Sequence, residues 1–153
     1  MTNRWTDGPG PRLRDVSEDE LLAQIFPLLP RGGPVVVAPG DDTALVRTAY
    51  GSVLATTDTM VRGRDWLDEW STGWQVGAKA VAQNLADVTA MGGRCTSMVL
   101  TLVADARTPV AWVEELAAGV GEWAREAGIV VTGGDLSSAP AGTHTVSITA
   151  LGS

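Results

Sequence analysis

Four short acidic motifs hold the residues of this sequence that could do chemistry. Each places an aspartate within three residues of glycine, threonine or asparagine, in the segments Gly40-Asp41-Asp42, Thr56-Thr57-Asp58-Thr59, Asn84-Leu85-Ala86-Asp87 and Gly133-Gly134-Asp135. Gathering several carboxylates in one pocket costs Coulomb repulsion, which a bound divalent cation reverses. We therefore predict a Mg²⁺ site that receives a phosphorylated ligand.

The residue types suit Mg²⁺, because this ion takes oxygen ligands, usually one or two carboxylates together with substrate phosphates. The pleat of a strand sends Thr56 and Thr57 to opposite faces. We expect the strand to end there, so that neighbouring residues can share a ligand. On the following helix, Lys79, Gln83 and Asp87 recur every four residues and form a polar stripe that we expect to border the pocket.

The glycines of the last motif have a separate role. Gly133 and Gly134 are expected to let the backbone approach phosphate closely while Asp135 reaches a metal. Taken alone, this motif could also cap a turn. The segment 40–42 is, by itself, more typical of a turn than of a ligand set, and the threonines at 56–59 are ordinary strand formers.

Asp87 points more strongly to function, because an acid within a mostly apolar helix lies near the core and needs a partner. Pairing with Lys79 or Arg94 is the structural alternative. We expect His144 to be a strand-face residue and Cys95 a small buried apolar group, so neither enters the mechanism. The tryptophans at 66, 70 and 74 are expected to pack.

The composition excludes several classes of protein. The chain has 153 residues, 44% of them hydrophobic, which suits one domain with a core. A net charge of −7 with dispersed basic residues argues against a nucleic-acid or anionic-membrane surface. One cysteine and one histidine exclude an intramolecular disulfide, a Cys-rich zinc site and a multi-histidine metal centre. Without a signal-peptide core or a membrane-spanning apolar run, we expect a soluble cytoplasmic protein.

The hydrophobic pattern predicts strands interleaved with helices. A short helix begins at the capping box of Ser17 and Glu20, and two long helices occupy 74–91 and the segment between Pro109 and Gly128. Strands are expected at 35–38, 44–46, 52–57, 97–103, 129–132 and 143–151. The predicted fold class is α/β (α+β), a mixed sheet packed against two long helices. Residues 1–16 form a loose arm and 17–153 a single domain.

Taken together and in this order, the motifs resemble the amino-terminal domain of thiamine-monophosphate kinase, in the aminoimidazole ribonucleotide synthetase-like superfamily. The resemblance runs from about Ser17 to Gly152. It rests on the segments 40–44, 56–61, 79–87 with 90–92, and 133–135.

The resemblance implies ATP-dependent phosphorylation of thiamine phosphate to thiamine diphosphate, with ATP as co-substrate and several Mg²⁺ ions. It implies metal ligands at Asp42, Thr56, Thr57, Asp58, Asp87 and Asp135, and nucleotide contacts at Gly134 and Asp135. No catalytic side chain is named, because phosphoryl transfer asks chiefly for positioning and charge neutralisation. The chain has no P-loop motif. Relatives also imply a homodimer in which two sheets complete a β-barrel, with 143–151 in the interface.

Two departures from the family pattern matter. Where the family shows Gly-x-His-Phe, this chain has Gly63-Arg64-Asp65-Trp66, so Asp65 holds the place of a substrate contact with opposite chemistry. Family members also continue into a second domain, whereas this chain ends at Ser153. We therefore expect the chain to be the metal- and nucleotide-binding half of the enzyme, inactive or incomplete alone.

Two alternative functions remain at this point. One is a non-catalytic nucleotide-binding or dimerisation module. The other is a different superfamily enzyme such as selenophosphate synthetase, against which the late position of Cys95 counts.

Overall fold

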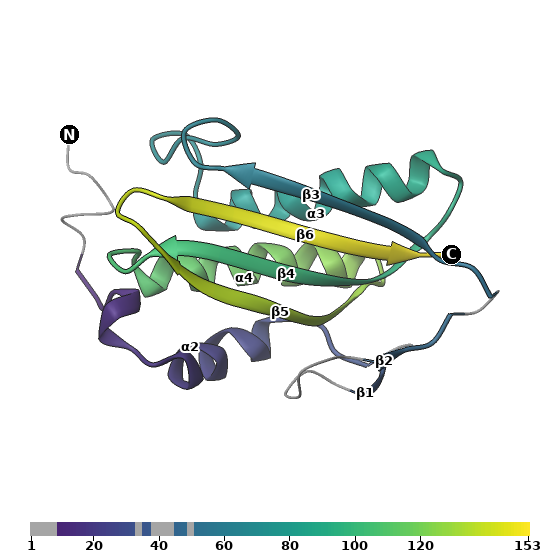
Figure 1. Cartoon of the computed structure of the whole chain (residues 1–153), viewed down its shortest axis with the longest axis horizontal. Coiled ribbons are helices and arrows are strands. Elements are labelled where there is room, and N and C mark those ends of the chain that lie inside the picture. The colour runs from purple at the N-terminus through teal and green to yellow at the C-terminus, as the bar shows by residue number, and fades with distance from the viewer. Residues whose placement is uncertain (1–8, 33–34, 38–44, 49–50) are drawn as a thin grey trace.

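The centre of the fold is a four-stranded mixed sheet in the order β3-β6-β4-β5 (Figure 1). The computed structural model describes residues 9–32, 35–37, 45–48 and 51–153. The strands are β3 (Leu54–Val61), β4 (Cys95–Asp105), β5 (Val130–Ala139) and β6 (His144–Gly152). β6 pairs antiparallel with both β3 and β4, whereas β4 and β5 are parallel. Parallel strands need a crossover connection, which the chain supplies as a helix.

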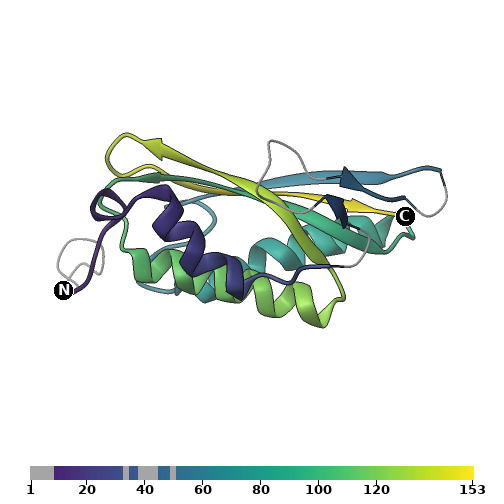
Figure 2. The same cartoon turned by 90° about the horizontal axis from the view of Figure 1, so that it is seen from below.

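Two long helices cover one face of this sheet. They are α3 (Gly73–Ala90), which joins β3 to β4, and α4 (Val110–Glu126), which is the crossover from β4 to β5. Figure 2 shows both helices on the same side of the strands, with α2 (Glu18–Ile25) beside α4. The opposite face of the sheet is turned to the viewer in Figure 1 and carries no helix of the described chain.

The smaller elements lie at the periphery. They are the 3₁₀ turns Leu13–Asp15 and Phe26–Leu28 and a two-stranded sheet of β1 (Val35–Val37) and β2 (Leu45–Val46). Within the predicted arm, the Leu13 and Arg14 amides donate to the carbonyls of Thr108 and Ala106, so this part of it lies against the β4–α4 loop.

The core lies between the sheet and the two helices. Alternate residues of β6, namely Val146, Ile148 and Ala150, are buried, and α3 and α4 cover them with residues such as Val81 and Val120. This period of two is the pattern of a strand with one face in the core. The prediction of a half-buried strand here is confirmed.

The predicted fold class is confirmed at the level of a mixed sheet with helices on one side, and the short helix and the two long helices that were predicted are all present. α2 begins at the predicted Ser17 box, and α3 begins at a second box formed by Thr72 and Gln75. The Thr108 hydroxyl, which stands where the sequence favours a helix cap, does not cap α4. Pro109 occupies the N-cap of α4, and the Thr108 hydroxyl donates to the Asp105 carbonyl instead.

Candidate metal and nucleotide site

A contact between β3 and α3 joins two of the predicted ligands. The Thr56 hydroxyl donates to Oδ2 of Asp87 at 3.2 Å, across 31 positions of sequence. Thr56 reaches α3 because it lies on the helix-covered face of β3, opposite the buried Ala150 of β6. Asp87 is exposed at the rim of this layer. The expectation that Asp87 lies near the core is therefore wrong, although it does have a partner in Thr56, while the Lys79 ammonium binds elsewhere.

Alternate residues of the segment 56–59 face opposite sides of the sheet. Asp58 pairs with the buried Ile148, so it shares the helix-covered face with Thr56. Thr57 faces the uncovered side, where its hydroxyl donates to the Ile148 carbonyl and accepts from Thr149. The expectation that the strand ends at this motif is wrong, because β3 continues to Val61.

A further oxygen lies one helical turn before Asp87. Asn84 is fully buried, and its amide donates to the Ala80 carbonyl. Its Oδ1 is buried without a hydrogen-bond partner in the described part of the chain. A buried polar atom left in this way is unfavourable and is normally satisfied by water or a ligand. The sequence pattern placed Asn84 in the polar stripe expected to border the pocket, but not among the metal ligands.

Asp135 lies far from this group. It is on β5, at the opposite edge of the sheet from β3, and faces the uncovered side, level with Thr101 of β4. Three strand spacings amount to about 14 Å. Its Oδ2 accepts from the Ser137 hydroxyl at 2.7 Å. The segment 133–135 neither follows the strand nor caps a turn, because β5 runs through it.

Packing between β4 and β5 explains why residue 134 is a glycine. A Cβ placed there would lie 2.1 Å from the Leu100 carbonyl oxygen of β4, so no larger residue fits beside that strand. The close backbone approach expected at this glycine is therefore to β4.

The described residues thus bring Thr56, Asp58 and Asp87 to one face and leave Asp135 on the other. Among residues 9–32, 35–37, 45–48 and 51–153, no cluster of three acidic, histidine or cysteine side chains could hold a metal. Asp42 lies outside the described residues. What the β3–α3 group offers is a set of oxygen donors, which matches hard cations rather than zinc.

The β3–α3 loop (residues 62–72) joins the end of β3 to the start of α3, at the other end of these elements from the Thr56–Asp87 contact, and contains Asp65 (Figure 1). Oδ2 of Asp65 accepts from the Val61 amide at 2.6 Å, and its carbonyl accepts from the Lys79 ammonium at 2.7 Å. The predicted polar stripe of α3 therefore connects the loop, at Lys79, with Thr56, at Asp87. Trp66 packs as predicted, whereas Trp70 is 79% exposed, so the packing prediction is wrong for it.

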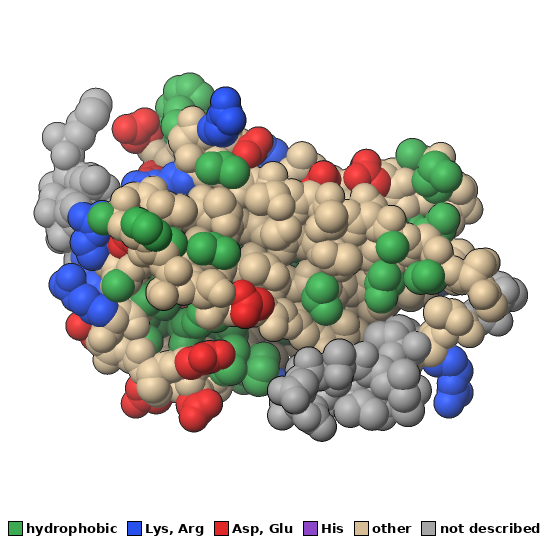
Figure 3. All heavy atoms as spheres, in the orientation of Figure 1, with side chains coloured by type: hydrophobic (Ala, Val, Ile, Leu, Met, Phe, Trp, Pro, Cys, Tyr) green, Lys and Arg blue, Asp and Glu red, His purple; other side chains and the backbone are tan. Residues whose placement is uncertain are grey.

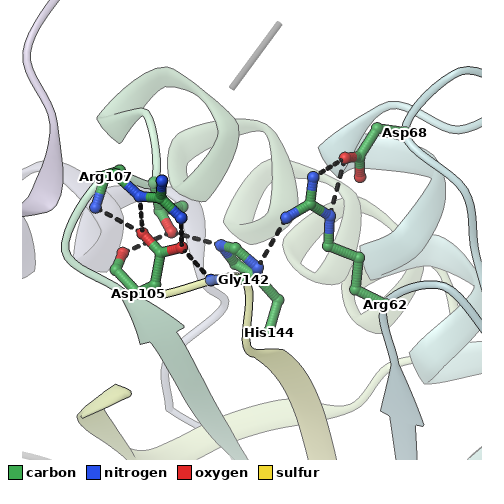
Figure 4. A network of polar contacts seen from close by, with 7 residues as sticks. Arg62, Asp68, Asp105, Arg107, Gly142 and His144 are labelled. Atoms are coloured by element: carbon green, nitrogen blue, oxygen red, sulfur yellow. Dashed lines mark hydrogen bonds and ion pairs between the residues drawn. The ribbon is translucent and has the colours of Figure 1, made fainter. Parts of the chain in front are cut away.

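One polar network near this loop was not predicted. Arg62 forms an ion pair with Asp68 and bonds to His144, while Asp105 binds Arg107 and the Gly142 amide (Figure 4). Arg62 and Arg107 lie 45 positions apart in the sequence, and the pairing of β3, β6 and β4 brings the charged residues together. Cys95, by contrast, is buried as expected, and burial raises the pKa of its thiol.

None of the helices in the described part of the chain combines the length and apolar character that crossing a bilayer requires.

The fold and the β3–α3 group define an α/β domain with a group of oxygen-bearing side chains at one edge of its sheet. Residues 40–153 match the family described as "AIR synthase related protein, N-terminal domain", and the chain belongs to that family.

Three relatives illustrate the similarity. Thiamine-monophosphate kinase of Mycobacterium tuberculosis is 37% identical over 142 residues, covering 93% of this chain and 42% of that protein. The crystal structure of thiamine-monophosphate kinase from Stenotrophomonas maltophilia K279a has a TM-score of 0.70 at 27% identity, covering 88% of this chain and 40% of that one. The structure of AaThiL complexed with AMPPCP and TMP has a TM-score of 0.63 at 30% identity, covering 74% and 36%. The chain therefore spans about two fifths of the length of the curated relatives it matches.

Proposed function

We propose that this chain is the metal- and nucleotide-binding part of a kinase that uses ATP to phosphorylate thiamine phosphate to thiamine diphosphate. The observation that carries the proposal is the 37% identity to a thiamine-monophosphate kinase over 93% of the chain. The relative named as complexed with AMPPCP and TMP supports the same pair of substrates. These relatives favour a thiamine-phosphate kinase over selenophosphate synthetase, and the proposed location is the cytoplasm.

The donors on the helix-covered face fit Mg²⁺. Thr56, Asp58 and Asp87 provide oxygens from two elements, and Asn84 adds a buried amide oxygen without a partner in the described residues. With Asp42, these residues would hold Mg²⁺, which supplies charge neutralisation to nucleotide phosphates when bound. Asp135, with Gly134, would meet the nucleotide on the uncovered side, and Thr57 shares that side.

The chain's own residues position the ligands. The hydrogen bond from Thr56 orients the Asp87 carboxylate, and Lys79 holds the backbone of the loop that contains Asp65. Asp65 would lie at the thiamine phosphate end of the site. Because the chain spans only part of its relatives, we expect it to bind Mg²⁺–ATP while turning over little or no thiamine phosphate alone.

We propose in addition that the chain forms a homodimer through its uncovered sheet face. Figure 3 shows this face, on which backbone and uncharged polar side chains cover the largest area, hydrophobic side chains are scattered, and charged side chains lie mostly toward the margins. Its hydroxyls satisfy one another, with Thr149 donating to Thr57 at 3.0 Å and Thr59 paired with Ser147 at 2.8 Å. Covering such a face desolvates few charges, and closing two sheets into a barrel would pair the edge strands β3 and β5.

Thermal unfolding tests the proposed metal site. With ATP at ten times its dissociation constant, we expect Mg²⁺ to raise Tm by about 3–6 °C, because ligand binding to the folded state adds about 1.4 kcal/mol. ATP without Mg²⁺ should leave Tm nearly unchanged.

The Asp87→Asn variant should lose most of the Mg²⁺-dependent rise. Glu126→Gln, which removes an exposed acid near the end of α4, is the matched control and should retain it. An equal ATP shift without Mg²⁺, or an unchanged shift in Asp87→Asn, would contradict the proposed site.

A further inference from the structure

His144, the single histidine of the sequence, is buried where three elements meet. It is the first residue of β6, and its ring contacts Arg62, which directly follows β3 (Figure 4). The ring also contacts Thr108 in the β4–α4 loop and Trp112 of α4. The Arg62 backbone amide also donates to the His144 carbonyl at 3.0 Å. No role in substrate or metal binding has been given to this residue above.

The hydrogen bonds assign the tautomer of His144. Arg62 Nη1 lies 3.2 Å from Nδ1, and a guanidinium can only donate, so Nδ1 accepts and carries no proton. The Thr108 hydroxyl donates its single proton to the Asp105 carbonyl at 2.7 Å. Nε2, which lies 2.6 Å from the same hydroxyl oxygen, is therefore the donor. The ring is the neutral Nε2–H form.

Two sets of contacts connect this ring to the β3–α3 loop. The polar set runs from Nδ1 through Arg62 to Asp68, whose Oδ2 accepts from two guanidinium nitrogens. The aromatic set runs through Trp112, which meets His144 edge-on at 6.4 Å and stacks on Trp66 at 6.1 Å. The loop is thus held at both 66 and 68 by groups that converge on one imidazole.

The loop needs this support because its own packing is imperfect. Trp66 Nε1 and Asp68 Oδ1 are buried without hydrogen-bond partners in the described part of the chain. Burying such atoms is unfavourable, since both would be hydrated if the loop opened. Contacts from outside the loop must therefore offset this loss.

We propose that His144 is a positioning residue for the proposed reaction: its neutral ring fixes the β3–α3 loop, and with it Asp65, and its protonation releases that loop. The inference rests on the proposed function only in assigning Asp65 to the substrate end. A proton on Nδ1 would remove the acceptor for Arg62 and place two cations in contact. The polar set would then break at its first step, while the hydrogen bond from Nε2 to Thr108 would remain.

The charges around the ring determine the direction of its titration. Burial and then the Arg62 charge lower the pKa of His144, while Asp105, Asp68 and a backbone hydrogen bond with Gly142 raise it, and the net change is downward. Arg107 faces Asp105 and partly neutralises it. The ring therefore stays neutral at pH 7, and its contribution to stability is complete above about pH 6.5 and declines as the pH falls through the lowered pKa.

The sole histidine makes the test direct. In ¹⁵N-labelled chain at pH 7.5, the imidazole nitrogen shifts should report the Nε2–H tautomer, and the Nδ1–H tautomer would overturn the proposal. Amide hydrogen exchange, corrected for intrinsic rates, should accelerate at least about fivefold in residues 62–71 between about pH 7.5 and the pH at which the ring titrates. Amides in the centre of α4 should not change.

Two variants separate positioning from simple packing. His144→Gln keeps an acceptor toward Arg62 and a donor toward Thr108 but cannot titrate, so its loop should be protected at both pH values. His144→Leu should lose loop protection at both. A pH response in His144→Gln equal to that of the wild type, or full protection in His144→Leu, would refute the inference. If His144→Leu does not fold, the comparison with His144→Gln still decides.

A last experiment adds substrate and tests the assignment of Asp65. Thiamine phosphate added with Mg²⁺ and AMPPCP should slow exchange of the 62–71 amides further in the wild type. Unchanged exchange, alongside the expected tautomer and pH response, would overturn the assignment of Asp65 to the substrate end and count against the proposed function, while the pH-dependent hold on the loop would stand.

Discussion

Asp105 ties three segments together at the end of β4. It is buried, and its carboxylate accepts from the Arg107 amide at 2.7 Å, the Arg107 guanidinium at 2.9 Å and the Gly142 amide at 2.6 Å. Burial alone would raise the pKa of Asp105, but these hydrogen bonds and the Arg107 charge outweigh it and hold the pKa well below its usual range. One ionised carboxylate thus joins the β4–α4 loop to the β5–β6 hairpin.

We predict that Asp105→Asn destabilises the chain by about 2–4 kcal/mol at pH 7, because an amide leaves at least one of the donors facing it unpaired. Urea unfolding measures the change. The wild-type advantage should persist above about pH 4 and shrink as the pH falls further, since a lowered pKa stabilises the fold only while the carboxylate is ionised.

The matched control for this prediction is Glu126→Gln, which removes an exposed acid from the end of α4 and should change the free energy of unfolding little. A loss under 1 kcal/mol in Asp105→Asn, or an equal loss at pH 7 and pH 3, would show that the carboxylate charge is not what binds these segments.

Individual residues were predictable where their neighbours in sequence determine their surroundings. The expectation that Asp87 needs a partner followed from its apolar helix, and burial of Cys95 followed from its type. Its partner, Thr56, lies 31 positions away in the sequence, and the two meet because β3 lies against α3. No local sequence pattern indicates that contact. The hydrogen bond between Arg62 and His144 could not be predicted for the same reason, because these residues are 82 positions apart in the sequence.

At the scale of elements, helices were easier to predict than strand boundaries. α3 has an Ala-rich segment closed by Gly92, which adopts a positive φ of 77°. β3 and β5 extend past Asp58 and Gly133, residues that disfavour strands, because pairing with β6 and β4 outweighs local propensity. The sequence pattern therefore placed each strand but misjudged which motif lies inside it.

The two long helices pack with their backbones in contact. A Cβ at Gly119 of α4 would lie 2.1 Å from the Trp74 carbonyl oxygen of α3, and one at Gly77 of α3 would lie 2.3 Å from the Leu116 carbonyl oxygen. Glycine weakens a helix interior by about 1 kcal/mol relative to alanine. At positions 77 and 119, glycine is favourable because it allows α3 and α4 to pack closely.

We predict that Gly119→Ala lowers the free energy of unfolding by about 1–3 kcal/mol despite the better helix propensity of alanine, because the methyl meets a backbone atom that cannot rotate away. Chemical denaturation measures it. Gly133→Ala adds the same methyl where the nearest atom, a Val99 side-chain carbon, is 3.9 Å away, and it should be tolerated. A Gly119→Ala chain as stable as the wild type would mean that the helices can separate without loss.

At the scale of the whole molecule, the two groups of proposed site residues lie on opposite faces of one sheet. Thr56, Asp58 and Asp87 belong to the layer between the sheet and α3, and Thr57 and Asp135 to the uncovered face. The sequence pattern predicted one pocket for all of them, because the motifs contain similar residues. Side chains alternate between the two faces along β3, and β3 and β5 lie at opposite edges of the sheet. A single copy of the chain therefore cannot bring these residues into one pocket.

We predict that the chain self-associates through the uncovered face, since this face holds few charges and the edge strands β3 and β5 each pair with one strand only in the described part of the chain. Sedimentation equilibrium should give a dimer for the wild type and a monomer for Thr149→Arg, which places a long cation at the centre of that face. Ala111→Arg adds the same charge at an exposed position of α4, in the other layer, and should remain dimeric. A monomeric wild type, or a dimer unaffected by Thr149→Arg, would remove the uncovered face as the interface and leave Asp135 exposed to solvent.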